Sequence, residues 1–226
     1  MKTSINADSG YIKARSSGKE GWSYEADYDH FKKGILDSFS RSDAPKSGRL
    51  LEIGCGAGNI TLWLAEMGYE VYGVDTTPKA IEWAKDRNEL STAKANFRLE
   101  DAGELTSFSD GYFDVVVDGR CLHWIYGPGR LKILQAVRRV LKANGFLLVS
   151  SQCCSPGSQP PIIDSQLTYD ASRQVVVNKS GDICAYFGIP ENIVAEIDKA
   201  GFEVLNWGVI PEQNSETVHI EALKNA

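Results

Sequence analysis

Residues 49–59 read Arg-Leu-Leu-Glu-Ile-Gly-Cys-Gly-Ala-Gly-Asn, and this stretch decides the fold. Its first five residues form a short apolar run, which is typical of a buried strand. The three glycines that follow predict a tight turn, because glycine adopts left-handed backbone conformations at little cost. Beyond the turn, Ile60, Trp63, Leu64 and Met67 recur at the spacing of one face of a helix. A strand, a glycine turn and a helix in this order let backbone N–H groups approach a ligand closely.

The alternation of strand and helix continues toward the C-terminus. Apolar runs predict further strands at 70–75, 96–99, 113–117 and 146–150. Helices are predicted between them, one starting at Thr77-Pro78, which supplies an N-cap and a proline at the first helical position. This alternation favours a mostly parallel sheet with helices on both faces.

The segments that flank this core differ from it. Tyr24, Tyr28, Phe31 and Ile35 lie at helical spacing, so an aromatic-faced helix is predicted from 24 to 39. After residue 151 a stretch rich in Ser, Pro and Gly predicts an irregular loop.

Further elements are predicted after this loop. Two short strands at 174–177 and 182–186 predict a hairpin, and a helix at 190–200 precedes strands at 202–209 and 217–223. We therefore expect a single domain, residues 1–226, in four parts: an N-terminal helical lid (1–48), a cofactor-binding core (49–151), a loop and hairpin insertion (152–189) and a C-terminal helix with two strands (190–226).

Composition excludes several classes of protein. The 226 residues carry a formal net charge of −6, with 42% hydrophobic and 24% charged residues, which is ordinary for a folded domain of 24.8 kDa. The acidic balance makes a nucleic-acid partner unfavourable, because phosphate binding relies on clustered Lys and Arg. No apolar run is long enough to cross a bilayer, and the polar start lacks a secretory signal. We therefore expect a cytoplasmic protein without a membrane partner. We expect it to be a monomer or a homodimer. Five cysteines without a CxxC pair predict reduced thiols and no metal site.

One carboxylate strengthens the case for a nucleoside ligand. Asp75 ends the second predicted strand, seventeen positions after Gly58, where a carboxylate can accept hydrogen bonds from both hydroxyls of a ribose. Asn59 stands where the dinucleotide fingerprint has its third glycine, and no Gly-Lys-Ser/Thr of a P-loop follows the turn. An adenosine-type ligand is therefore favoured, whereas an NAD site and a P-loop are not.

These segments together resemble the class I S-adenosylmethionine-dependent methyltransferases. Residues 51–59 resemble the first motif of that family, Val74-Asp75 its ribose-binding acid, and 99–105 its adenine loop. Residues 113–116 and 140–146 resemble its later strands, so the resemblance covers about residues 50 to 151. It implies a three-layer, Rossmann-like α/β fold whose mostly parallel seven-stranded sheet has an antiparallel last strand.

The resemblance also implies the cofactor, S-adenosyl-L-methionine, with S-adenosyl-L-homocysteine as product, and the residues that bind it. Glu52 is expected to orient the methionine end, the glycines to allow close approach, Asp75 to hold the ribose and Asp101 to accept from the adenine amino group. Thr76 stands where the family usually has a larger apolar residue against the adenine. The expected cofactor contacts are Glu52, Gly54, Gly56, Gly58, Asp75, Thr76, Asp101, Ala102 and Asp118.

The acceptor side is less constrained by sequence. His123 and Trp124 follow the 113–117 strand at the edge where ligands bind, so His123 is the candidate general base and Trp124 a candidate wall of the substrate site. Structural packing of His123 is an equal alternative. Tyr24 and Tyr28 are the candidate substrate contacts from the N-terminal lid. The adjacent Cys153 and Cys154, with Cys121 near the expected site, raise the alternative of a thiolate-bound acceptor such as arsenite.

Three functions follow from these expectations. Methyl transfer to an O, N or S atom of a small molecule fits the size and charge best, because in-line displacement needs mainly correct positioning. A protein or RNA methyltransferase, and a non-catalytic module that binds S-adenosylmethionine, are the alternatives.

Overall fold

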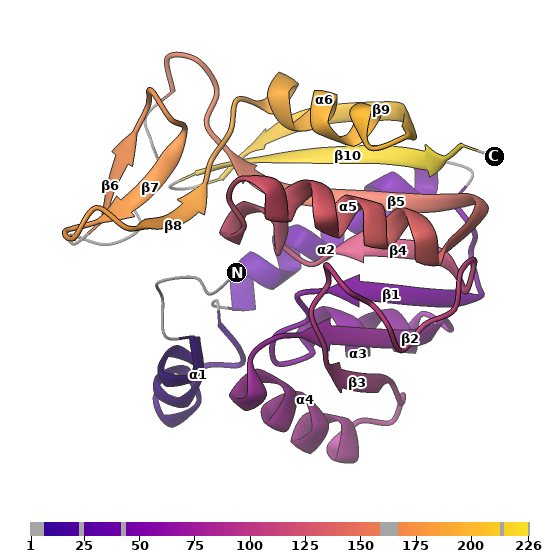
Figure 1. The fold of residues 1–226 in the computed structure, drawn as a ribbon. Coiled ribbons are helices and arrows are strands. Elements are labelled where there is room, and N and C mark those ends of the chain that lie inside the picture. The colour runs from indigo at the N-terminus through magenta and orange to yellow at the C-terminus, as the bar shows by residue number, and fades with distance from the viewer. Residues whose placement is uncertain (1–6, 23–24, 42–43, 159–166, 213–214, 226) are drawn as a thin grey trace.

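A computed structural model describes residues 7–22, 25–41, 44–158, 167–212 and 215–225 of the chain. Its centre is a seven-stranded sheet in the order β3-β2-β1-β4-β5-β10-β9 (Figure 1). The strands of this sheet are β1 (Arg49–Ile53), β2 (Glu70–Asp75), β3 (Asn96–Leu99), β4 (Phe113–Asp118), β5 (Leu141–Cys153), β9 (Phe202–Pro211) and β10 (Glu216–Lys224).

Strand β10 is the exception to the parallel order. The pairs from β3 through β5 are all parallel, whereas β10 runs antiparallel to both β5 and β9. The predicted mostly parallel sheet with an antiparallel last strand is therefore confirmed.

Helices cover both faces of this sheet, because its strands are apolar on both sides. In β1, Leu51 and Ile53 pack into the core beneath α5 (Pro128–Val140) and α6 (Pro190–Lys199). The alternate residue, Leu50, packs into the opposite core. That second core is covered by α2 (Glu25–Arg41), α3 (Asn59–Glu66) and α4 (Pro78–Leu90). Strands with no polar face are what a sheet covered on both sides requires.

The insertion after β5 is larger than the predicted hairpin. Strands β7 (Val175–Asn178) and β8 (Ile183–Tyr186) form the expected antiparallel pair, and β6 (Leu167–Asp170) adds a third strand beside β7. This small sheet lies at the same end of the molecule as α1, where the parallel strands end (Figure 1).

The N-terminal region contains a helix that the sequence analysis did not predict, α1 (Ala7–Ser16). Its apolar pattern is weak, with only Tyr11 and Ala14 buried, and Gly10 lowers its helix propensity. Tertiary packing explains that glycine, since a Cβ at residue 10 would lie 2.5 Å from the ring of Trp22. Within the described residues, no helix combines the length and apolar character needed to cross a membrane.

Candidate functional site

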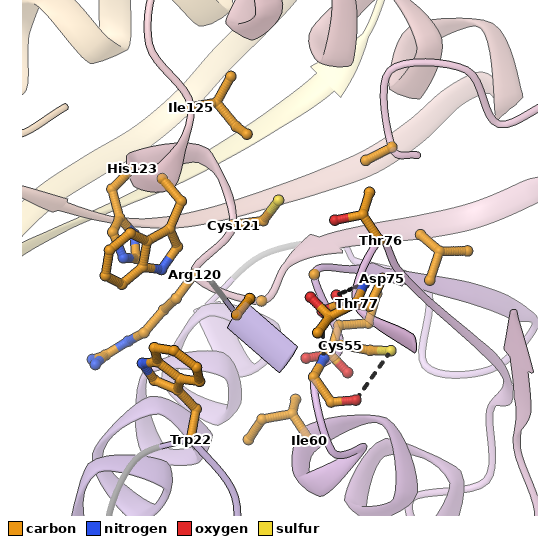
Figure 2. Close-up of a pocket in the computed structure, with 18 of the residues that line it drawn as sticks. Trp22, Cys55, Ile60, Asp75, Thr76, Thr77, Arg120, Cys121, His123 and Ile125 are labelled. Carbon is orange, nitrogen blue, oxygen red and sulfur yellow. Dashed lines mark hydrogen bonds between the residues drawn. The ribbon is translucent and has the colours of Figure 1, made fainter. Parts of the chain in front are cut away.

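A cavity of about 430 Å³ lies where β1, β2 and β4 end. The glycine turn, Asp75, Thr76, Asp101 and Ala102 line one part, which we call the glycine half. Aromatic side chains line the other part, the aromatic half, together with Arg120 and His123. Figure 2 shows the two halves side by side, with Asp75, Thr76 and Thr77 on one side, Trp22, Arg120 and His123 on the other, and Cys121 between them. The aromatic side chains are Trp22, Tyr28, Phe31, Trp124 and Phe187.

The glycine turn leaves no room for side chains. Gly54 and Gly56 have φ angles of 70° and 53°, a region that L side chains rarely adopt. A Cβ on Gly54 would lie 2.5 Å from the Cβ of Cys121, and one on Gly56 would lie 2.6 Å from the hydroxyl oxygen of Tyr11. Both residues line the cavity, so the bare backbone forms part of its wall.

Gly58 has a different role from the one expected. It does not line the cavity, and a Cβ there would lie 2.7 Å from the Phe97 ring. With φ at 80° it caps the start of α3. Close packing of α3 against its neighbours therefore explains this glycine without a ligand contact.

Asp75 is fixed by the turn beneath it. One carboxylate oxygen accepts a hydrogen bond from the backbone N–H of Gly56 (3.0 Å) and the other from that of Thr77 (2.8 Å). Each oxygen retains a further lone pair for a ligand. Burial raises the pKa of this carboxyl, an effect that the two backbone donors oppose.

Two more carboxyls lie deeper. Glu52 lines the cavity and is buried, accepting a hydrogen bond from the Thr61 hydroxyl, and burial raises its pKa to about 8. Asp118 is fully buried, does not line the cavity, and accepts hydrogen bonds from the N–H groups of Cys121 and Leu122. Burial raises the pKa of Asp118 to about 7. The structure thus places Asp118 behind the cavity wall, where it fixes the loop after β4, and not at a ligand contact.

The remaining expected cofactor contacts lie on two loops. Thr76 is exposed and follows β2, while Asp101 and Ala102 follow β3. All three line the cavity. One oxygen of Asp101 accepts from the N–H of Gly103 at 2.7 Å, which shapes this loop and leaves the second oxygen for a ligand.

His123 lies in η1 (Leu122–Trp124) on the wall of the aromatic half. The side chain of His123 is buried. Its ring centroid lies 5.0 Å from that of Trp124 and 5.8 Å from that of Phe187. Its Nδ1 has no hydrogen-bond partner among the residues that the structure describes. Burial and the charges of Arg120 and Arg130 hold the pKa of His123 well below its usual value. The free imidazole is therefore neutral, as a general base must be, but the same surroundings oppose its protonation.

The N-terminal contacts are partly as expected. Tyr28 lines the aromatic half, whereas Tyr24 lies outside the described residues. Trp22 packs its ring centroid 6.3 Å from that of Trp124 and 5.0 Å from that of Tyr11. These contacts bring α1 and the following loop over the cavity.

Several lining residues were missed by the sequence analysis. Arg120 and Gln152 come at or just beyond the ends of β4 and β5 and carry the same positional signal as His123. Tyr11, Phe187 and Ser215 come from segments distant from the core motifs, and no local pattern marks them.

The cysteines do not form a soft-ligand site. Cys153 packs into the core beneath α5, whereas Cys154 packs with Cys184 against the small sheet. Neither lines the cavity, and burial raises the pKa of both thiols. No cluster of three metal-ligating side chains occurs among the described residues. A thiolate-bound acceptor at Cys153 and Cys154 is not supported.

The cavity as a whole suits a ligand with two different ends. Its glycine half offers carboxylates and bare backbone, which match hydroxyl and cationic groups, and holds no cluster of cations for a pyrophosphate. The aromatic half offers ring faces for a flat apolar group.

Comparison with known proteins agrees with this arrangement. Residues 51–149 match the model of the methyltransferase domain family. A ubiquinone biosynthesis O-methyltransferase of Cereibacter sphaeroides is 33% identical over 134 residues, which are 58% of this chain and 53% of that protein. The chain spans about half the length of most of the curated relatives it matches.

Two solved structures share the fold. A SAM-dependent methyltransferase of Methanosarcina mazei is 26% identical, with a TM-score of 0.66 over 80% of this chain and 94% of that one. The 1,6-didemethyltoxoflavin N1-methyltransferase of Burkholderia thailandensis, bound to 1,6-didemethyltoxoflavin and S-adenosylhomocysteine, is 18% identical, with a TM-score of 0.68 over 96% of this chain and 85% of that one.

Proposed function

The chain belongs to the class I S-adenosylmethionine-dependent methyltransferases, and on this premise we propose that it transfers a methyl group from S-adenosylmethionine to a small molecule. The cofactor occupies the glycine half in this proposal, and the acceptor occupies the aromatic half.

The glycine half fits the cofactor by its donor set. Asp75 has free lone pairs for the two ribose hydroxyls, and Asp101 has an unoccupied oxygen for the adenine amino group. Glu52 lies at the bottom of the cavity, where burial disfavours its charge in the free protein. A cationic ligand restores that charge, because an opposite charge nearby lowers the pKa of a carboxyl. Gly54 and Gly56 provide the close approach that side chains there would block.

Methyl transfer requires the protein mainly to hold the cofactor and the acceptor in the correct relative position. When bound, S-adenosylmethionine supplies a methyl group on a sulfonium sulfur, which an acceptor atom displaces in line. The residues around Trp22, Trp124 and Phe187 exclude water from the aromatic half and orient the acceptor. In this proposal the unpartnered Nδ1 of His123 accepts a hydrogen bond from the acceptor, and its lowered pKa makes it a weak general base in the free protein.

One observation carries the choice of a small molecule, namely that the cavity is covered from two sides. Tyr11 and Trp22 cover it from the N-terminal region, and Phe187 covers it from the segment after β8. A protein or RNA substrate needs an open edge at the methyl group. The relative named as a ubiquinone biosynthesis O-methyltransferase supports the same choice.

The direct test uses methyl-labelled S-adenosylmethionine. We expect the purified protein, incubated with labelled cofactor and a cell extract, to transfer label to the small-molecule fraction. An Asp75→Ala variant serves as the control for label that arises without the site. Label found only in protein or RNA would contradict the proposal and favour a macromolecular acceptor. Tight cofactor binding without any transfer would favour a binding module.

A further inference from the structure

The aromatic half contains a cationic side chain, Arg120, whose neighbours satisfy only some of its hydrogen-bond donors. Arg120 lines the cavity, and its Nη2 forms an ion pair with Glu212. Its Nε is buried without a hydrogen-bond partner among the described residues. Resting on the function proposed above, we propose that the acceptor is a flat aromatic compound with an ionisable hydroxyl group, and that Arg120 binds its oxygen.

The walls set the shape of this ligand. Trp22 and Trp124 meet edge to face, and the His123 and Phe187 rings are tilted toward each other at an interplanar angle of 36°. Rings fixed in this way present flat, apolar surfaces with few polar atoms. A planar ring system fills such a space better than a flexible chain does.

The backbone and the ion pair hold Arg120 in place. Its φ angle is 64°, a left-handed conformation that is uncommon outside glycine and that clusters at functional sites. Glu212 also accepts hydrogen bonds from the hydroxyls of Ser215 and Thr217, both at 2.9 Å. Its charge is therefore shared among three donors. The guanidinium also lies over the Phe31 ring, 5.7 Å from its centroid.

The charges around His123 favour an anion. Burial and the charges of Arg120 and Arg130 oppose a positive charge on its ring. Burial disfavours a charge of either sign, whereas the two guanidinium groups stabilise a negative charge placed beside the ring. A cationic acceptor, such as a protonated amine, is disfavoured for the same reason. The unpartnered Nδ1 of His123 is a second polar atom that the ligand can satisfy.

The geometry favours a single oxygen over a carboxylate. Arginine binds a carboxylate best through two parallel N–H groups, but Nη2 of Arg120 is already bonded to Glu212. Because both pairs of parallel N–H groups of a guanidinium include Nη2, the bond to Glu212 competes with bidentate binding, and the other N–H groups of Arg120 suit one oxygen atom, as in a phenol or a ring enol. The ionised form of such a group is also the better nucleophile toward a methyl group.

The test uses 4-nitrophenol, whose neutral and ionised forms absorb at different wavelengths. The ligand is titrated against the protein with and without S-adenosylhomocysteine, at a pH where about half of the free compound is ionised. We expect binding to shift its ionisation equilibrium about tenfold toward the phenolate, which is one pKa unit. Preferential binding of the neutral form, or no binding in either state, would overturn the proposal. Tighter binding of 4-nitrobenzoate than of the phenolate would overturn the hydroxyl class.

Variants of the ion pair separate binding from folding. Glu212→Gln removes the competing carboxylate, so we expect phenolate affinity to increase severalfold. The double variant R120M/E212Q removes both partners, which avoids a buried unpaired charge, and we expect it to abolish the shift. Arg49→Met is the matched control, because Arg49 lies at the start of β1, over Tyr112 and beside Glu70. An unchanged shift in the double variant would assign the effect to other residues.

Calorimetry with S-adenosylhomocysteine distinguishes failure of this inference from failure of the proposed function. Cofactor binding with no phenolate shift would overturn only the acceptor assignment. A phenolate shift without any cofactor binding would overturn the proposed function and leave the aromatic site in place.

Discussion

The two halves of the cavity are built in different ways. The glycine half comes from consecutive strand ends of the core and is fixed by backbone hydrogen bonds, such as those from Gly56 and Thr77 to Asp75. The aromatic half is assembled from side chains that lie far apart in sequence, from Trp22 through His123 to Phe187. A ligand common to a whole family needs a fixed backbone site, whereas a site made from separate side chains can change one residue at a time.

The largest expected effect tests the glycine half. Asp75→Ala removes the carboxylate that we propose binds two ribose hydroxyls, and it leaves two backbone N–H groups unpaired. Hydrogen bonds to a charged group contribute about 1.5 kcal/mol or more each, so we expect S-adenosylhomocysteine affinity to fall about 100-fold in calorimetry. Asp75→Asn, which retains one acceptor oxygen, should lose less. If a folded Asp75→Ala protein binds S-adenosylhomocysteine about as tightly as the parent does, the glycine half is not the cofactor site.

The glycine turn provides a second test with a matched control. Gly56→Ala places a Cβ 2.6 Å from the Tyr11 hydroxyl, whereas Gly68→Ala, also at positive φ, has no atom within 4 Å. Both should lose about 1 kcal/mol of stability from backbone strain. Only Gly56→Ala is expected to lose cofactor affinity, by about tenfold. Equal affinities in the two variants would show that the turn does not contact the cofactor.

His123 tests the aromatic half. Its replacement should affect turnover more than cofactor affinity, because it lies beside Trp124 and Phe187 and away from Asp75 (Figure 2). For His123→Ala we expect about a tenfold or greater loss in the rate of label transfer, with cofactor affinity changed by less than about twofold.

His123→Phe separates the ring from its nitrogens. If this variant restores turnover, the residue acts by packing alone. Retained turnover in both variants would remove His123 from the reaction.

The smallest expected effect is on the pH dependence of stability. The pKa of Glu52 is raised to about 8 in the folded protein, so the folded state holds a proton that the unfolded state releases above its ordinary pKa. The free energy of unfolding therefore falls as pH rises through this window and levels off above about pH 8.

Glu52→Gln keeps an acceptor for Thr61 and removes the titration. We expect roughly 1 kcal/mol less loss of stability between about pH 6 and pH 7, measured by urea unfolding at each pH. An identical pH profile in parent and variant would show that Glu52 is ionised in the folded protein.

The sequence predicted the core closely and the edges poorly. Strand β1, the glycine turn and β2 were predicted at their observed positions, because apolar runs and glycines report local backbone geometry. The predicted 146–150 strand is longer, Leu141–Cys153, and includes Asn144, whose φ angle is 57°. Helix α1 and strand β6 were missed, since their residues carry weak periodicity and depend on contacts with other segments for their packing.

What the sequence alone determined about this protein is the backbone of the glycine half, Asp75 and the turn before it. Those residues are neighbours in the chain or at adjacent strand ends, so their spacing fixes their geometry. Only the tertiary structure decided that Gly58 serves packing, that Asp118 lies behind the wall, and that Arg120 meets Glu212. Contacts between distant segments depend on how the layers pack, and a pattern confined to one element carries no information about its partner in another.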